Sequence, residues 1–160
     1  KILPKKQKSR NIIANYQKLV IEHARKPQNF GCMELHSDSS KGVNPLCGDK
    51  IRIYILQEKG RISKISFEGV GCAISIASAS LLTETLKNQS VAQAKKYAKN
   101  FIMIMNSNHE SSENKKKFNN RDLETLMAVK DFPTRIKCAT LCWQTFLSAI
   151  EGKDIVVTTE

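Results

Sequence analysis

The chain has 160 residues, 41% of them hydrophobic, and its 26 Lys and Arg against 15 Asp and Glu give a formal net charge of +11. A chain of this size and apolar content forms one domain with a buried core, which excludes a disordered protein. The longest uncharged stretch, residues 69–83, contains several serines. It is shorter than the roughly 20 apolar residues of a membrane span, so we expect no transmembrane segment.

The cysteine content and the distribution of basic residues indicate the cellular compartment and the kind of partner. The number of cysteines is odd, five, and the chain does not open with an apolar leader and a cleavage site. We therefore expect reduced thiols in a cytoplasmic compartment rather than a secreted disulfide framework. The basic residues are dispersed along the chain with few aromatic residues among them, which argues against a nucleic-acid interface.

The N-terminal part is expected to begin with a flexible basic segment, residues 1–10, that lies outside the domain. The domain itself is expected to span residues 11–152. Apolar residues at helical spacing predict an amphipathic helix over residues 11–25, which ends where Lys26 is followed by Pro27.

The strands are predicted in the first half of the chain. Residues 33–40 predict a first strand, followed by a turn-rich loop over 41–49. Apolar residues alternate over 51–56, residues 59–61 form a Gly-containing turn, and the alternation resumes at Ile65 and Phe67, which predicts a β-hairpin. These segments indicate a small antiparallel sheet of about three strands.

The second half of the chain is predicted to be helical. Apolar residues at helical spacing predict helices from residue 72 to about 86, over 91–105, over 121–129, and around Trp143 up to a cap at Gly152. Residues 106–120 are rich in Asn, Ser and Lys and predict an exposed insertion, and residues 153–160 are expected to be a C-terminal tail. Strands followed by helices indicate the α+β class.

Three cysteines lie where the predicted chain changes direction. Cys47 falls in a loop before a strand, Cys72 lies between a strand and a helix, and Cys138 is near a helix start. Gly48 and Gly71 lie next to two of them, and glycine allows the backbone to approach a ligand closely. This placement favours a metal site.

Asp49 completes a candidate set of four ligands. Three thiolates, from Cys47, Cys72 and Cys138, and one carboxylate suit tetrahedral zinc. Such a site has excess negative charge, and Arg135 lies three residues before Cys138. The paired Cys-x-x-Cys motif of a zinc ribbon is missing, so ordinary core cysteines are the alternative on spacing alone.

Three motifs, in the same order, resemble the SufU/IscU/NifU family. The resemblance covers about residues 15–152 and implies a compact α+β domain that gathers the three cysteines and the aspartate at one end. The motifs are Asn44-Pro45-Leu46-Cys47-Gly48-Asp49, then Gly69-Val70-Gly71-Cys72-Ala73-Ile74-Ser75, and Arg135-Ile136-Lys137-Cys138-Ala139-Thr140-Leu141.

Two features distinguish the types within that family. Scaffolds of the IscU type carry a histidine directly before the third cysteine and a Leu-Pro-Pro-Val-Lys motif just upstream, whereas this chain has Lys137 and no double proline over 129–134. The insertion over 106–120 resembles that of the SufU type. The resemblance thus implies a zinc-dependent sulfurtransferase for iron–sulfur cluster assembly. An IscU-type scaffold, which would carry an Fe–S cluster on the same ligands, is the alternative.

The resemblance also implies a mechanism. A SufS-like cysteine desulfurase would be the partner, and one of its histidines would replace Cys47 on the zinc. The freed Cys47 thiolate would attack the partner's persulfide, and the sulfur would pass to a SufBCD-like scaffold. Arg135 would offset the negative charge and hold the side chains of Cys47 and Asp49, so we expect it to support the reaction.

The remaining cysteines and histidines are expected to play no part in this chemistry. Cys32 and Cys142 are predicted to be packed core thiols, with a reserve ligand as the alternative for Cys142. No metal role is assigned to a histidine: His23, His36 and His109. A remote alternative for the whole chain is a structural zinc module that binds nucleic acid through its positive charge.

Overall fold

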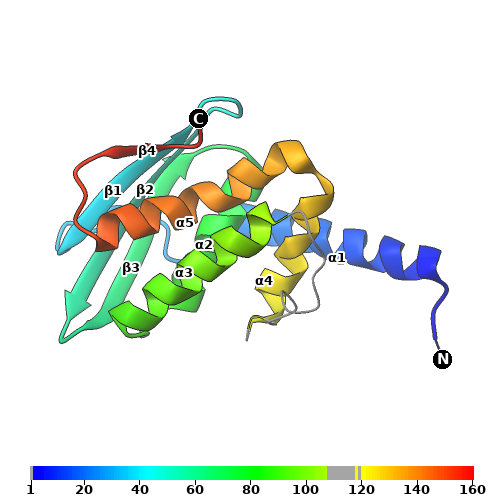
Figure 1. Ribbon diagram of the computed structural model, residues 1–160, viewed down its shortest axis with the longest axis horizontal. Helices are drawn as coiled ribbons and strands as arrows, with labels where there is room; N and C mark the ends of the chain where they lie inside the picture. The colour runs from blue at the N-terminus through cyan, green and yellow to red at the C-terminus, as the bar shows by residue number, and fades with distance from the viewer. Residues whose placement is uncertain (1, 108–117, 119) are drawn as a thin grey trace.

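The computed structural model describes residues 2–107, 118 and 120–160, and it has the α+β architecture expected from the sequence (Figure 1). One sheet is covered by helices on one face, and the N-terminal helix projects beyond the body. The described elements are α1 Lys5–Arg25, β1 Asp38–Asn44, β2 Asp49–Glu58, β3 Arg61–Val70, α2 Ala73–Leu86, α3 Val91–Asn106, α4 Arg121–Leu126, η2 Met127–Asp131, η3 Pro133–Arg135, α5 Ile136–Ile150 and β4 Val156–Thr158.

The sheet has four strands in the order β3-β2-β1-β4, not about three. The predicted hairpin is confirmed as the antiparallel pair β2 and β3, and β1 pairs antiparallel with β2. The additional strand, β4, comes from the expected C-terminal tail and pairs parallel with β1. A three-residue strand has too short a pattern to be recognised without its partner.

The first strand lies later in the chain than predicted. β1 spans Asp38–Asn44 rather than residues 33–40, so part of the expected loop belongs to the sheet. Gly42 suggested a turn, but its role is close packing. A Cβ atom on Gly42 would clash with Thr145 Oγ1 and would lie 3.0 Å from the Leu141 side chain, both on α5. The glycine therefore lets α5 lie directly on β1.

The core is formed between the helices and one face of the sheet. Helix α5 packs against β1, β2, α2 and α3, and its Trp143 is fully buried. The Trp143 ring stacks on Phe101 of α3 at 4.3 Å between centroids, a pairing that adds to the free energy gained by burying their area.

The helices agree with the predictions except at their ends. Helix α1 begins at Lys5, so residues 5–10, expected to be flexible, continue the helix. They were missed because they are exposed and have no apolar stripe. Helix α5 ends as predicted, with Gly152 at φ +66° donating to Ala149 O and Lys153 donating to Ser148 O, which is a Schellman cap. Among the described residues, no helix has the length and apolarity that crossing a membrane requires.

The expected insertion over 106–120 lies mostly outside the described residues. Of its described members, Phe118 is buried against Phe101 and Tyr97, and Asn120 caps the start of α4. The predicted helix over 121–129 is divided into α4 and the 3-10 helix η2.

Candidate metal centre

A tight turn between β1 and β2 carries Cys47. The turn is closed by Asn44, the last residue of β1, which pairs with Asp49, the first residue of β2. The Cys47 amide donates to Asn44 O at 3.3 Å, and Gly48 has φ +69°, a conformation that glycine adopts without steric cost. The turn presents the half-buried Cys47 thiol at the end of the sheet.

Asp49 is held in place by hydrogen bonds to both of its carboxylate oxygens. The side chain is only 1% exposed. Its Oδ1 accepts from the Cys72 amide at 2.8 Å, and its Oδ2 accepts from Asn44 Nδ2 at 3.0 Å. A carboxylate oxygen has two lone pairs, so each oxygen can still bind a metal.

Gly71 makes the approach of Asp49 to Cys72 possible. A Cβ atom on Gly71 would lie 2.5 Å from Asp49 Oδ1 and 3.2 Å from its Cα. Any side chain at this position would therefore displace the carboxylate or the backbone. Gly71 of the second motif therefore leaves the space that Asp49 of the first motif occupies.

Cys138 enters the site from the first turn of α5 and is fully buried. Asn44 Nδ2 lies 3.4 Å from its Sγ atom, so one amide group contacts both Asp49 and Cys138. The hydrogen bond between the Cys138 and Cys72 thiols, together with burial, raises the pKa of Cys138. The same hydrogen bond lowers the pKa of Cys72 to about 7.

The structure brings together three of the four predicted ligands. The Sγ atoms of Cys47 and Cys138 and a carboxylate oxygen of Asp49 lie within 4.8 Å of one another. Cys72 is half-buried and lies outside that mutual distance. It is therefore adjacent to the cluster rather than part of it.

Arg135 faces this cluster from the end of η3. Its Nη1 lies 3.6 Å from Cys47 Sγ, and the side chain is exposed. The guanidinium therefore places a positive charge beside the Cys47 thiol. Lys137, the other cation beside Cys138 in the sequence, is exposed, and no hydrogen bond or ion pair of its side chain is seen among the described residues.

Two residues that support the site were not assigned a role from the sequence. Asn44 lies in the first motif, and its position there was the only signal. Thr159 lies in the expected tail and donates to Asn44 Oδ1 at 2.9 Å. Its contribution depends on the pairing of β4 with β1, which the sequence pattern did not indicate.

The other cysteines differ from each other. Cys142 is buried as predicted, its Sγ lies 3.4 Å from Ser78 Oγ, and burial raises its pKa to about 12. The expectation that Cys32 packs in the core is wrong, because Cys32 is exposed. It follows the irregular segment after α1, where a single Phe-Gly pair gave no reliable sign of burial.

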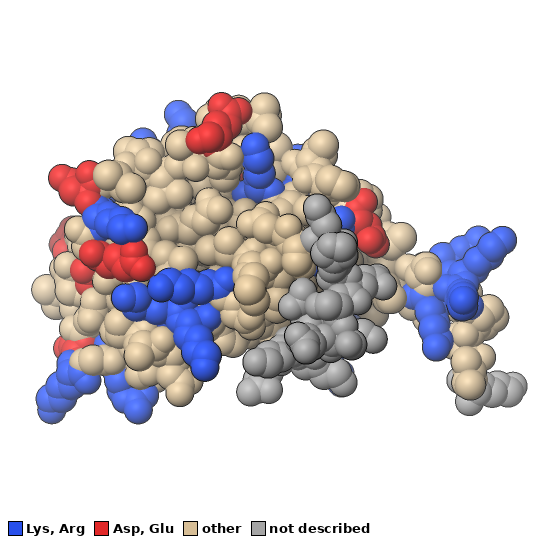
Figure 2. Space-filling view, in the orientation of Figure 1, with Lys and Arg blue, Asp and Glu red and all other residues tan. Residues whose placement is uncertain are grey.

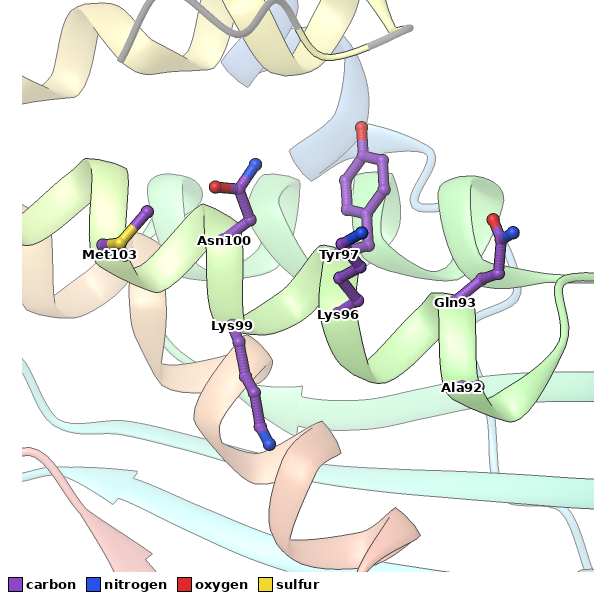
Figure 3. A pocket seen from close by; sticks show the side chains of 7 residues that line it. All are labelled: Ala92, Gln93, Lys96, Tyr97, Lys99, Asn100 and Met103. Carbon is purple, nitrogen blue, oxygen red and sulfur yellow. The ribbon is translucent and has the colours of Figure 1, made fainter. Parts of the chain in front are cut away.

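The donor set fits zinc. Thiol groups and a carboxylate are ligands that zinc accepts in a tetrahedral arrangement, and three of them already converge. By contrast, a hollow of about 600 Å³ along α3 contains no cysteine, aspartate or histidine, and its side chains point in different directions (Figure 3). This hollow therefore lacks the metal-ligating side chains that the cysteine cluster has.

Comparisons with known proteins show which sequences this chain resembles. The NifU-like N-terminal domain family matches residues 15–140. The zinc-dependent sulfurtransferase SufU of Bacillus subtilis is 34% identical over 84% of this chain and 88% of its own length. The iron–sulfur cluster assembly scaffold protein IscU of Streptococcus pyogenes is 32% identical over 85% of this chain and 82% of its own length.

A solved structure shows the same fold. The SUF-system iron–sulfur cluster assembly scaffold protein of Fervidobacterium islandicum superposes with a TM-score of 0.74 at 26% identity, covering 86% of this chain and 97% of the other. Sequence, fold and cysteine cluster therefore lead to one conclusion: this chain belongs to the NifU-like N-terminal domain family, the SufU and IscU proteins of iron–sulfur cluster assembly.

Proposed function

We propose that this chain is a zinc-dependent sulfurtransferase that accepts persulfide sulfur from a cysteine desulfurase for iron–sulfur cluster assembly. The observation that carries the proposal is the difference in exposure within the cluster. Cys138 and Asp49 are buried, whereas Cys47 is half-buried on a turn at the end of the sheet. Cys72 is half-buried too, but of the three converging ligands Cys47 is the one that a partner's active site can reach.

The ligands in this proposal are Cys47, Asp49, Cys138 and, after a small movement toward the cluster, Cys72. Zinc bound there would hold the thiols in their deprotonated form and reduce their reactivity until the partner docks. Asn44 holds the side chains of Asp49 and Cys138 in place relative to each other, because its amide contacts both.

The transfer step is a thiol exchange at Cys47. Its thiolate attacks the terminal sulfur of the desulfurase persulfide, a new S–S bond forms on Cys47, and the bond to the desulfurase cysteine breaks. The electron pair of the broken bond leaves on the desulfurase cysteine as a thiolate. No oxidant or reductant is needed, because the sulfur keeps its oxidation level as it moves.

The surroundings of Cys47 suit a partner surface. Arg135 places a guanidinium 3.6 Å from its Sγ atom, which stabilises the attacking thiolate. Leu46, the residue before Cys47, is 69% exposed. Exposed apolar side chains beside a reactive group are typical of an interaction site.

The second candidate is a scaffold on which an Fe–S cluster is assembled. It is favoured by the relatives that are named as scaffold proteins and by the thiol ligands, which iron also binds. It uses the same residues, so the difference between the two candidates lies in which species forms on them.

The nucleic-acid alternative finds little support in the charge distribution. On the face shown in Figure 2, Lys and Arg lie in several separate groups over the body and the projecting helix, and acidic residues are interspersed on the body. A nucleic-acid interface gathers its basic residues on one continuous surface.

The experiment that tests the proposal measures zinc content and the stimulation of a SufS-type desulfurase by the same preparations. We expect about one zinc per chain and faster cysteine turnover with the wild-type protein. Cys47→Ala is expected to abolish the stimulation. Cys32→Ala is the matched control, because it removes an exposed thiol outside the cluster and is expected to leave the stimulation unchanged.

Two results would contradict the proposal. One is full stimulation by Cys47→Ala. The other is an iron–sulfur chromophore that the protein transfers to apo-proteins while it fails to stimulate the desulfurase, which would establish the scaffold function instead.

A further inference from the structure

A second group of metal-ligating side chains lies outside the cysteine cluster. His23 of α1, Glu84 of α2 and Asp122 of α4 each bring a ligand atom within 4.8 Å of the other two. These residues are far apart in the sequence and come from three different helices. They share no residue with the site described above.

The His23 ring is fixed from behind. Its Nδ1 lies 2.8 Å from Ser80 Oγ, and Ser80 is fully buried on α2. The same hydroxyl oxygen accepts from the Gln28 amide at 2.8 Å. With Nδ1 occupied, Nε2 is the nitrogen that remains for a ligand, and a hydrogen bond to the second ring nitrogen is typical of metal-binding histidines.

Asp122 is brought to Glu84 by a specific contact. Asn120 caps α4, because its Oδ1 accepts from the Asp122 amide at 2.9 Å. The other end of the same side chain, Nδ2, donates to Thr85 Oγ1 at 2.9 Å. Thr85 directly follows Glu84, so Asn120 joins the start of α4 to the part of α2 that carries Glu84.

The two carboxylates lack ion-pair partners among the described residues. The described part of the chain has two ion pairs, Lys18–Glu22 and Lys153–Glu151, and neither includes Glu84 or Asp122. The negative charges of the two carboxylates beside the imidazole are therefore not offset by an ion pair in the described part of the chain, although the net charge of the chain is +11. Arg25 and Lys26 line the groove of about 400 Å³ next to His23 and Glu84, but neither forms an ion pair with them.

We propose that His23, Glu84 and Asp122 form a second divalent metal site that uses no cysteine. One imidazole nitrogen and two carboxylate oxygens suit Mn²⁺, Fe²⁺, Co²⁺ or Zn²⁺, whereas the thiol-rich site favours softer metal ions. Both carboxylates are exposed, so water would fill the remaining positions. A bound ion would link α1 and α4 to α2.

The test uses the full chain with its cysteine site filled by zinc, and Mn²⁺ as the probe. Free Mn²⁺ is followed by its electron paramagnetic resonance signal during a titration. We expect about one Mn²⁺ per chain and a rise in the thermal unfolding temperature on binding. Asp122→Asn and His23→Gln are each expected to weaken binding by about tenfold or more.

Glu22→Gln is the matched control. It removes a carboxylate that lines the same groove but does not belong to the group of three, so Mn²⁺ binding is expected to be unchanged. Glu84→Gln, a change at an exposed side chain, checks the result if His23→Gln fails to fold. Cys47→Ala should bind Mn²⁺ like the wild type, which separates this proposal from the proposed function.

Either of two outcomes overturns the proposal. In the first, the zinc-loaded wild-type protein binds no Mn²⁺ at millimolar concentrations. In the second, Glu22→Gln weakens binding as much as Asp122→Asn, which would mean that the ion is attracted diffusely by surface carboxylates.

Discussion

Asn44 and Asp49 face each other across the turn that carries Cys47, and their side chains are joined by a 3.0 Å hydrogen bond from Nδ2 to Oδ2. The same amide nitrogen lies 3.4 Å from Sγ of Cys138. A single side chain thus orients two candidate ligands that are far apart in the sequence. Groups behind the ligands that orient them are typical of protein metal sites.

Asn44→Ala is expected to weaken zinc binding roughly 10–100-fold, because Asp49 and Cys138 lose their common donor. Competition with a chromophoric chelator measures the affinity. Thr159→Val is the companion variant: it removes only the hydroxyl that donates to Asn44 Oδ1, so a smaller loss is expected. Equal zinc affinity for Asn44→Ala and the wild type would show that Asn44 does not orient the ligands.

Gly71→Ala is expected to damage the site and the fold together. The added methyl group would lie 2.5 Å from Asp49 Oδ1, and overpacking of this kind costs about 1–3 kcal/mol. The free energy of unfolding, measured with a denaturant, and the zinc affinity should both decrease. Gly60→Ala is the comparison, because Gly60 has φ +73° but open space around it. It should lower stability through backbone strain while leaving zinc affinity intact.

The sheet and most helices could be predicted because their apolar periodicity is local. The alternation of isoleucines in β2 and the helical stripes of α3 and α5 are visible in short windows of sequence. β4 has only three residues and is stabilised by its parallel pairing with β1. Its existence depends on a partner more than 100 residues away, which periodicity does not reveal.

The candidate site could be predicted where a cysteine lies at a point at which the chain changes direction, as at Cys47 and Cys138. The role of Asn44 was not, because its contact with Cys138 spans 94 positions. His23 was assigned no metal role, and its proximity to Glu84 and Asp122 follows only from the packing of three helices. Contacts of this kind are set by tertiary structure.

The metal-free protein is expected to have one unusually acidic thiol. The hydrogen bond from Cys138 lowers the pKa of Cys72 from 9.0 to about 7. A lowered pKa favours the thiolate, so half of Cys72 is ionised near pH 7, and the fraction falls as the pH decreases. Alkylation with iodoacetamide, mapped by mass spectrometry after zinc removal, should follow this profile, since the thiolate is the nucleophile.

Cys138→Ala is the control for that assignment. Without its donor, Cys72 should be alkylated with a midpoint at higher pH, closer to an ordinary thiol. Cys142 provides an internal reference, since burial raises its pKa to about 12 and it should remain unmodified in the folded protein. An alkylation midpoint of Cys72 near 9 in the parent protein would contradict the hydrogen bond between the two thiols.

Substitution of Arg135 is expected to impair sulfur transfer without impairing metal binding. Its Nη1 lies 3.6 Å from Cys47 Sγ, but it offers no ligand to a metal. Arg135→Gln is therefore expected to lower desulfurase stimulation severalfold, while zinc content remains near that of the wild type. Arg135→Lys keeps the charge and should recover part of the activity, because only the planar fork is lost.

Lys137→Gln distinguishes this local effect from a general loss of positive charge. Lys137 is exposed and lies two residues from Arg135, so its removal changes the net charge by the same amount. Little change in stimulation is expected, because no contact joins its side chain to Cys47 in the described part of the chain. If both variants lowered stimulation equally, Arg135 would act through long-range attraction of the partner. A selective loss with Arg135→Gln would instead identify the guanidinium as the group that stabilises the attacking thiolate.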